Sequence, residues 1–353
     1  MNRTLRTLRH AAVVLTTVAG LTALAACGGG ASDAVGGGGA AVPAVPVADG
    51  SGGSVKLYAF SVPKPGFDVL IPAFNATPAG KGVAFQASYG ASGDQSRKVA
   101  AGAAADFVNV SVAPDMTRLV DAGLVARSWN AGAHQGIPFG SVVAIVVRKG
   151  NPKGIKTWDD LLRPGVEVVT PNPFSSGSAK WNLLAPYAEK SVGGTNPQAG
   201  LDYLTKLIGQ HVKVQPKSGR EASDTFLQGE GDVLLSYENE ALFLERGHDP
   251  VEHFIPPTTF KIENPAAVVS AGKNAKAAQA FNDYIYTPAA QTLLAMAGFR
   301  VVDTTVAAAF ASSFPTPSKE YTIDDLGGWK TVDSTLFKKD VGTIAKIYDA
   351  ATK

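Results

Sequence analysis

The stretch VEVVTPNPFSSGSAKWNLL (residues 166–184) places an apolar run, a proline-rich turn and a helical pattern in direct succession. The run at 167–170 is rich in β-branched residues, which favour strands. Ser-Ser-Gly-Ser at 175–178 then leads into a helix that is expected to begin near Ser178, since serine is a common N-cap residue. This succession predicts a strand that enters a helix through a loop of small residues, which is the repeating unit of α/β proteins.

The same alternation runs along the chain from residue 55 onward and predicts an α/β fold. The expected strands are 55–60, 83–87, 107–110, 142–147, 167–170, 212–215, 233–236 and 266–269. The expected helices begin near Gly93, Pro114, Trp158, Ser178, Asn196, Ala222 and Ala275. Ligands of open α/β sheets bind beyond the carboxyl ends of strands, where loops enter helices.

Three of these strand–loop–helix junctions are rich in serine and glycine. Their residues are Ser88, Gly90, Ser92 and Gly93, then Ser175, Ser176, Gly177 and Ser178, then Ser218, Gly219, Arg220, Glu221 and Ala222. A helix start exposes N–H groups that have no partner inside the helix, and the helix dipole adds partial positive charge. Such a start binds oxyanions without a charged side chain. Capping alone explains any single junction, so the presence of three is what favours an anion site.

The N-terminal residues have the layout of an export signal. Arg3, Arg6 and Arg9 precede the apolar run 11–26, which ends in Leu-Ala-Ala-Cys at Cys27. This ending resembles the lipobox of bacterial lipoproteins, so 1–26 is predicted to be a signal peptide and Cys27 a lipidated residue. Residues 27–54 then read as a flexible tether rich in glycine and alanine. The expected location is the outer face of the cytoplasmic membrane.

Composition restricts the possible functions of the exported chain. Removing residues 1–26 removes three arginines and no acidic residue, so the formal net charge falls from +2 to −1. No basic stripe with interleaved aromatic residues is present, which argues against nucleic-acid binding. With a single cysteine and scattered histidines, we expect no metal site and no cofactor.

A catalytic interpretation stays open as an alternative from a different class. The motif GASGD (residues 90–94) is reminiscent of a nucleophile elbow, but Asp94 occupies the last place of the pattern G-x-S-x-G. A surface serine hydrolase would use Ser92 or Ser176 with a histidine from elsewhere in the chain. A surface adhesin is a third class, against which the three serine–glycine helix starts count.

Four stretches together resemble the sulfate-binding protein family, the substrate-binding components of bacterial sulfate ABC importers. They are SYGASGDQSRKVAAGAAADFVNVS (88–111), VVRKGNPKGIKTWDDLLRPGVEVVTPNP (146–173), SSGSAKWNLLAPYA (175–188) and GDVLLSYENEA (231–241). The resemblance implies a two-lobed periplasmic-binding-protein type II fold, in which each lobe is a mixed sheet flanked by helices and the ligand lies in the cleft between them. By this resemblance, lobe 1 comprises 55–135 and 237–295, and lobe 2 comprises 136–236 and 296–353.

The resemblance also implies which residues hold the ligand. They are Ser92, Gly93, Ser176, Gly177, Ser178, Ala222 as a backbone donor, and Tyr237, with Arg220 in a supporting role. Two substitutions depart from the family pattern: Ser178 replaces a glycine, and Tyr237 replaces a tryptophan. A tyrosine hydroxyl can donate a hydrogen bond as an indole does, but it can also accept one.

Two further departures concern the first junction and the loop after the first strand. The family's backbone donor in that loop falls at Pro63, which has no N–H, so Ser61 or Lys64 would have to take its place. Asp94 stands where a neutral or basic residue is expected. Directed into the cleft, its carboxylate would accept a proton from phosphate, whereas directed elsewhere it would leave a site for sulfate.

The function implied is a receptor that captures sulfate and delivers it to the permease subunits of an ABC importer, without catalysing a reaction. The receptor is expected to be a monomer. Alternatives within the class are other oxyanions, with thiosulfate first and then molybdate or phosphate.

Overall fold

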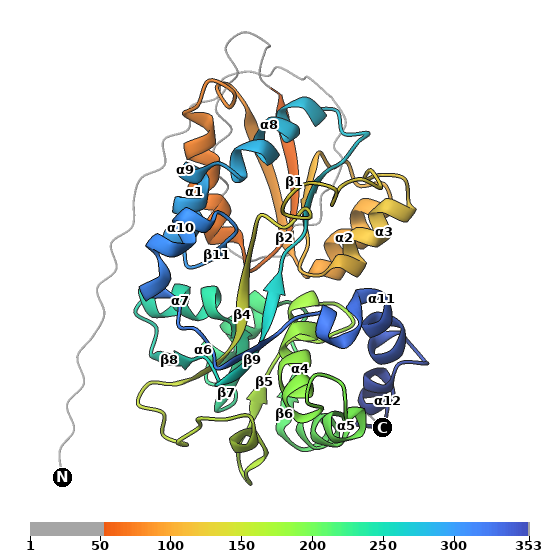
Figure 1. Cartoon of the computed structure of the whole chain (residues 1–353), viewed down its shortest axis with the longest axis vertical. Helices are drawn as coiled ribbons and strands as arrows, with labels where there is room; N and C mark the ends of the chain where they lie inside the picture. The colour runs from red at the N-terminus through yellow and green to blue at the C-terminus, as the bar shows by residue number, and fades with distance from the viewer. Residues whose placement is uncertain (1–52, 352–353) are drawn as a thin grey trace, which may run out of the picture. The chain divides into compact units, whose positions relative to one another are not determined.

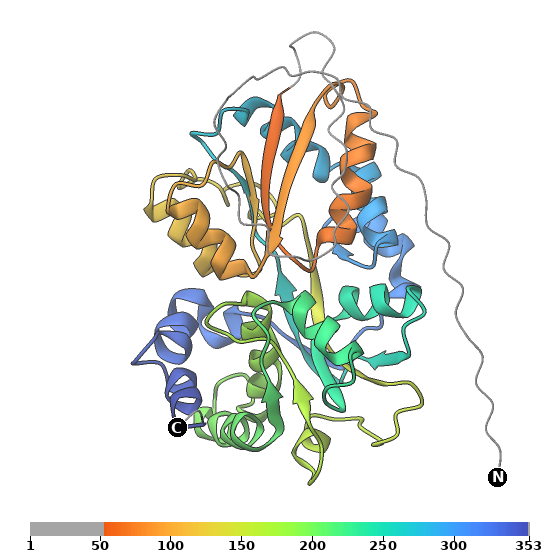
Figure 2. The same cartoon turned by 180° about the vertical axis from the view of Figure 1, so that it is seen from behind.

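The computed structural model describes residues 53–351, and its strands form two sheets (Figures 1 and 2). The signal peptide expected at 1–26, the predicted lipidation site Cys27 and nearly all of the expected tether lie outside the described residues. No helix among the described residues has the length and apolar character needed to cross a membrane.

The first sheet has the strand order β10-β3-β1-β2. Its strands are β1 (Ser54–Phe60), β2 (Ala84–Gly90), β3 (Phe107–Asn109) and β10 (Ala266–Val268). β1 pairs in parallel with both β2 and β3, whereas β10 is antiparallel to β3. Its helices are α1 (Lys64–Asn75), α2 (Ser92–Ala100), α3 (Ala113–Asp121), α8 (Ala275–Ile285) and α9 (Pro288–Met296). Figure 1 shows α1 and α9 on the side of this sheet away from α2 and α3.

The second sheet has the main order β12-β9-β4-β7-β5-β6, with β8 and β11 also paired to β4. Its strands are β4 (Phe139–Arg148), β5 (Val168–Val169), β6 (Val212–Val214), β7 (Val233–Tyr237), β8 (Val251–Phe254), β9 (Thr258–Glu263), β11 (Arg300–Val301) and β12 (Lys319–Tyr321). The α-helices of this part are α4 (Gly177–Lys190), α5 (Pro197–Lys206), α6 (Gly219–Leu227), α7 (Glu238–Arg246), α11 (Gly328–Val332) and α12 (Thr343–Ala351), whereas α10 (Thr304–Ala309) contacts α9. Short 3-10 turns lie at Asp159–Leu162, Ala311–Ser313 and Asp324–Leu326, and π-helical turns at Leu207–His211 and Asp333–Phe337.

The chain passes from the second sheet to the first between β9 and β10, at residues 264–265. Strands β8 and β9 hydrogen-bond to β4, although the sequence places 237–295 as a whole in lobe 1. The strand pairing therefore disagrees with that assignment for residues 251–263. The contacts also disagree with the assignment of everything after residue 295 to lobe 2. Strand β11 pairs with the start of β4, next to the crossing, and α10 contacts α9 of lobe 1. We propose a division in which the crossings lie near residues 138, 264 and 315.

The α/β prediction, with two mixed sheets flanked by helices, is confirmed by these sheets. Each of the eight predicted strands is present, with shifted ends. The helices α1, α7, α9 and α10 and the strands β8, β9, β11 and β12 were not predicted, whereas α11 and α12 lie in the C-terminal segment 321–350, whose sequence has a helical pattern. Helix α1 follows Pro63 and has Pro65 in its first turn, where proline is tolerated because its N–H is not needed there.

An aromatic cluster fills the core of the first sheet and its helices. Phe281 of α8 is fully buried, and its ring centroid lies 5.2 Å from that of Phe74, 4.8 Å from that of Phe85 and 5.5 Å from that of Phe107. Edge-to-face aromatic contacts of this kind add to the stabilisation that burial provides.

We predict that Phe281→Ala lowers the free energy of unfolding by about 3–5 kcal/mol, because the lost ring leaves a cavity that the sheet cannot close. Urea denaturation measures this loss. Gln279→Ala, an exposed change on the same helix, should alter stability by no more than about 0.5 kcal/mol. A loss below about 1 kcal/mol for the phenylalanine variant would contradict this description of the core.

Candidate functional site

Three helices begin at the space between the two sheets: α2, α4 and α6. The N–H of Gly93 in α2 donates to the carbonyl oxygen of Ser175, just before α4, at 3.0 Å. A Cβ atom on Gly177, the first residue of α4, would lie 2.7 Å from Cβ of Ser111. A Cβ atom on Gly219, the first residue of α6, would lie 3.1 Å from Oγ of Ser178. The helix starts therefore converge so closely that two of them have no room for a side chain.

Tyr237, the last residue of β7, is buried between Ser111 and Ser178. It is 1% exposed, and its hydroxyl lies 2.7 Å from Oγ of Ser111, with either atom able to donate. The indole Nε1 of Trp181 donates to the carbonyl oxygen of Ser111 at 2.8 Å. Burial raises the pKa of Tyr237, so its hydroxyl stays protonated and can donate a hydrogen bond.

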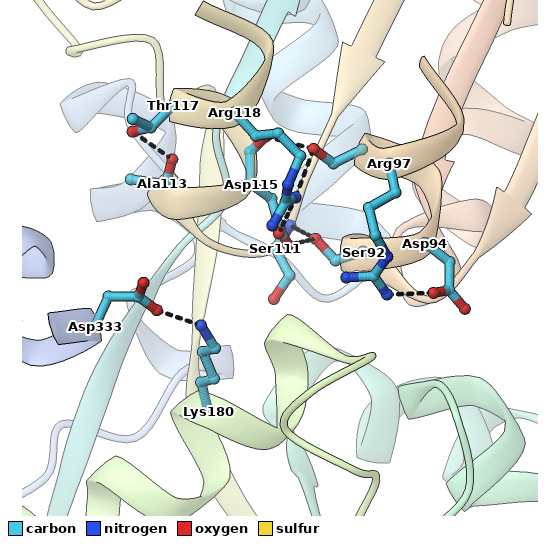
Figure 3. Close-up of polar contacts among 11 residues, drawn as sticks. Ser92, Asp94, Arg97, Ser111, Ala113, Asp115, Thr117, Arg118, Lys180 and Asp333 are labelled. Carbon is cyan, nitrogen blue, oxygen red and sulfur yellow. Dashed lines mark hydrogen bonds and ion pairs between the residues drawn. The ribbon is translucent and has the colours of Figure 1, made fainter. Parts of the chain in front are cut away.

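The hydroxyl of Ser92 is fixed by partners on its own side of the cleft (Figure 3). It donates to Oδ2 of Asp115 at 2.7 Å and accepts the N–H of Ser111 at 2.9 Å. The other carboxylate oxygen of Asp115 lies 2.9 Å from the guanidinium of Arg118. Ser92 therefore offers a ligand its backbone N–H rather than its hydroxyl.

Asp94 is directed to its own helix. Its carboxylate pairs with the guanidinium of Arg97, and 39% of its side chain is exposed. Figure 3 shows this pair at the edge of the group formed by Ser92 and Asp115. Asp94 is also absent from the lining of the cavity beside Gly93 and Arg97, so its carboxylate is not directed into that cavity.

The second junction keeps its serine hydroxyls near the cleft. Ser176 is the N-cap residue of α4, yet its side chain makes no capping hydrogen bond, while its N–H donates to Asn172 at 2.8 Å. Ser176 and Ser178 are 2% and 3% exposed, respectively. The capping role that the sequence favours for a single serine junction is thus not the role of Ser176.

The third junction corrects the assignment of Ala222 as a backbone donor. Helix α6 begins at Gly219, three residues earlier than expected, so the N–H of Ala222 already donates to Ser218 at 3.0 Å within the first turn. Gly219 is the first residue of the helix, so its N–H has no acceptor within the helix. A Cβ on Gly219 would meet Val62 at 2.8 Å.

Arg220 lies behind the start of α6. Its guanidinium is 3.0 Å from Oε2 of Glu240 and stacks on the ring of Phe243, with 4.3 Å from Cζ to the ring centroid. Ser223 of the same helix donates to the other oxygen of Glu240 at 2.8 Å. Burial raises the pKa of Glu240, and Arg220 and Ser223 oppose that rise. Arg220 therefore ties α6 to the start of α7.

The loop after β1 supplies Ser61 rather than Lys64. The hydroxyl of Ser61 accepts the N–H of Arg220 at 3.4 Å, whereas Lys64 forms an exposed ion pair with Asp68 at 2.7 Å. Val62 lies between Ser61 and Pro63, packs against Gly219 and carries a backbone N–H. It is the residue of this loop that the sequence reasoning missed.

Ser111 is the other residue missed. It follows the strand expected at 107–110 and precedes the helix expected near Pro114, so it satisfies the same strand–loop–helix rule as the three chosen junctions. Unlike the three chosen junctions, its loop contains no glycine. In the structure it contacts Ser92, Trp181 and Tyr237.

Neither Ser92 nor Ser176 has a histidine partner within residues 53–351. Nδ1 of His211 is hydrogen-bonded to the carbonyl oxygen of Val166 at 2.9 Å, and Nδ1 of His253 lies 2.7 Å from the carboxylate of Glu245. His134 stacks on the ring of Tyr286. A serine nucleophile needs a base within hydrogen-bond reach, and no histidine of the described residues supplies one to either serine.

The chain is similar in sequence and in structure to known solute-binding proteins. A family model described as "Bacterial extracellular solute-binding protein" matches residues 55–300. The chain is 38% identical over 315 residues to a sulfate-binding protein of Synechococcus elongatus, covering 85% of this chain and 89% of the relative. It is 34% identical over 279 residues to a thiosulfate-binding protein of Pseudomonas aeruginosa, covering 76% and 83%. The solved structure of the sulfate-binding protein SubI from Mycobacterium tuberculosis H37Rv has a TM-score of 0.80 and 61% identity, and the match covers 81% of this chain and 99% of that chain.

The buried phenol predicts a loss of stability at alkaline pH. An unfolded tyrosine titrates near pH 10, and burial raises the pKa of Tyr237 in the folded chain. Above about pH 10 the unfolded state therefore releases a proton that the folded state keeps, and stability falls by up to about 1.4 kcal/mol per pH unit. Urea unfolding at pH 9 and pH 11 should show a smaller alkaline loss for Tyr237→Phe than for the unaltered chain. Equal losses would contradict the buried, neutral state of this hydroxyl.

Proposed function

Because the chain belongs to the sulfate-binding protein family of ABC transporters, we propose that it captures sulfate outside the cytoplasm and delivers it to the permease of an ABC importer. The observation that carries this proposal is the convergence of the starts of α2, α4 and α6 on one space closed by Tyr237. Members of this family bind solutes and do not catalyse reactions, so the hydrolase alternative is set aside.

Sulfate would be held by neutral donors. The N–H groups at Gly177, Ser178 and Gly219 have no partner within their helices, and the helix dipoles add partial positive charge at those points. The hydroxyls of Tyr237 and Ser178 add donors on side chains that are nearly fully buried. Closure of the lobes around the anion removes water, which strengthens each of these contacts in a medium of lower dielectric constant.

The charges around the cleft favour sulfate over phosphate. Sulfate carries no proton at neutral pH, whereas phosphate keeps one that needs an acceptor. The two carboxylates nearest the start of α2 are already engaged, Asp94 with Arg97 and Asp115 with both Ser92 and Arg118. An unsatisfied buried donor costs about 1–3 kcal/mol, so phosphate should bind about tenfold to hundredfold more weakly.

Thiosulfate is the second candidate, because a relative named a thiosulfate-binding protein matches most of the chain. Thiosulfate differs from sulfate by one sulfur in place of an oxygen, and sulfur is a weaker hydrogen-bond acceptor. The site would bind both anions, with the sulfur in the position that has fewest donors.

The cellular setting is part of the same proposal. Export by residues 1–26 and lipidation of Cys27 would fix the chain to the outer face of the membrane, and the tether would let it reach a permease. The receptor would act as a monomer, with ATP hydrolysis left to the importer's own subunits.

Calorimetric titration of the purified, desalted chain with sulfate, thiosulfate, molybdate and phosphate tests the ligand. We expect sulfate to bind most tightly and phosphate at least about tenfold more weakly, for the reason given above. Binding of phosphate as tight as that of sulfate would refute the donor-only site. An absence of binding to all four anions would refute the proposed function.

Gly177→Ala tests the geometry of the site. The added Cβ would meet Ser111 at 2.7 Å, so the start of α4 and the loop after β3 could no longer approach each other. Overpacking of this kind costs about 1–3 kcal/mol, which predicts a dissociation constant for sulfate about tenfold to hundredfold higher. Gly132→Ala is the matched control, because a Cβ at Gly132 meets nothing within 4 Å. Equal affinities for the two variants would contradict this placement of the anion.

A further inference from the structure

The C-terminal segment 328–351 packs along the helix whose start forms the anion site. Figures 1 and 2 both show α11 and α12 beside α4 and α5. Val332, Leu336, Phe337, Ile344 and Tyr348 of this segment are buried in the core that contains Trp181. The segment is therefore part of the same packed unit as α4.

Three of its side chains contact the N-terminal end of α4 or the loop before it. The ring of Trp329 lies edge-on to Trp181, with 4.7 Å between centroids and 77° between planes. The carboxylate of Asp333 lies 2.5 Å from Nζ of Lys180, a side chain that is only 15% exposed.

The third contact is made to the loop. The ring of Tyr348 lies edge-on to Phe174, with 5.6 Å between centroids. Phe174 stands only two residues before Ser176, the N-cap residue of α4. The three contacts thus act on residues 174–181, the stretch that contains Ser176, Gly177 and Ser178.

The contact between Trp329 and Trp181 is connected to Tyr237 through Ser111. The ring of Trp181 is nearly perpendicular to that of Trp329, and its Nε1 donates to the carbonyl oxygen of Ser111 at 2.8 Å. Ser111 in turn is hydrogen-bonded to the hydroxyl of Tyr237 at 2.7 Å. A shift of Trp329 would reach Tyr237 through two side chains in direct contact.

The segment also forms part of the wall of the cleft. Gly93, Gly177 and Arg118 line a cavity of about 600 Å³, and Asp333 and Phe337 of the C-terminal segment line it as well. Figure 3 shows Lys180 and Asp333 facing the group formed by Ser92, Asp115 and Arg118. Helix α11 contacts α3, so the segment touches elements that belong to both sheets.

We propose that Trp329, Asp333 and Tyr348 are positioning residues for the anion site, because they hold the start of α4 where its N–H groups meet the ligand. The proposal rests on the proposed function, since it takes sulfate as the ligand. It gives the C-terminal segment a role in affinity that goes beyond packing on the second sheet.

Two variants test the proposal through the dissociation constant for sulfate, measured by calorimetry, and its dissociation rate, measured by stopped-flow fluorescence. Trp329→Ala should raise the dissociation constant about two- to tenfold, the value of one edge-to-face aromatic contact. Asp333→Asn should raise it about two- to fivefold, the value of one partly exposed ion pair. Both should act mainly by speeding dissociation.

Two further variants serve as controls. Trp329→Phe keeps an aromatic edge against Trp181 and should restore affinity to within about twofold of the unaltered chain. Asp159→Asn removes an ion pair to Lys190 at the opposite end of the same helix, where the distance is 2.8 Å. It should leave sulfate affinity unchanged.

The possible outcomes separate the two proposals. Affinity that is unchanged in Trp329→Ala and Asp333→Asn, with urea midpoints lowered, would assign the segment a structural role alone and overturn the inference. Affinity lowered equally by Asp159→Asn and Asp333→Asn would overturn it as well. A failure of the unaltered chain to bind sulfate would overturn the proposed function, and it would be seen before any variant is compared.

Discussion

The backbone N–H groups at the start of a helix have no partner inside the helix, and this fold directs three such starts at one buried space. The rest of the site depends on that constraint. A buried N–H needs a partner, which can be an acceptor from the chain, a water molecule or an anion. The N–H of Gly93 has an acceptor from the chain, the carbonyl oxygen of Ser175. At Gly177 and Gly219 the absence of a Cβ atom lets neighbouring segments approach the other two helix starts closely, and we propose an anion as the partner of their N–H groups.

Four charged side chains beside the helix starts form two ion pairs. Asp115 pairs with Arg118 and Arg220 pairs with Glu240, and in both pairs the carboxylate is nearly or fully buried. A free cation here would bind any anion by its charge, whereas paired charges leave selection to the direction and number of the donors. The same arrangement explains how a chain with a formal charge near zero can be built to hold a divalent anion.

The sequence was sufficient for the α/β fold and for the junctions at Ser92 and Ser176, because a strand, a small-residue loop and a helix follow one another there without interruption. It was insufficient wherever the decisive feature was a helix boundary or a contact between distant segments. Helix α6 begins three residues before its expected start, and this shift moves the free N–H from Ala222 to Gly219. The orientation of Asp94 depended on whether its carboxylate reached Arg97, which the sequence alone could not decide.

The contacts of Ser111 could not be predicted from the sequence, because its four hydrogen-bond partners are distant from it along the chain. Its N–H donates to Ser92, its carbonyl oxygen accepts from Trp181 and from Asn264, and its hydroxyl meets Tyr237. Asn264 lies where the chain passes from the second sheet to the first, so this one residue connects the crossing, the starts of α2 and α4, and the base of the site. Movement at the crossing would change the hydrogen bond between Asn264 and Ser111, and under the proposed function this contact would link closure of the lobes to binding of the anion.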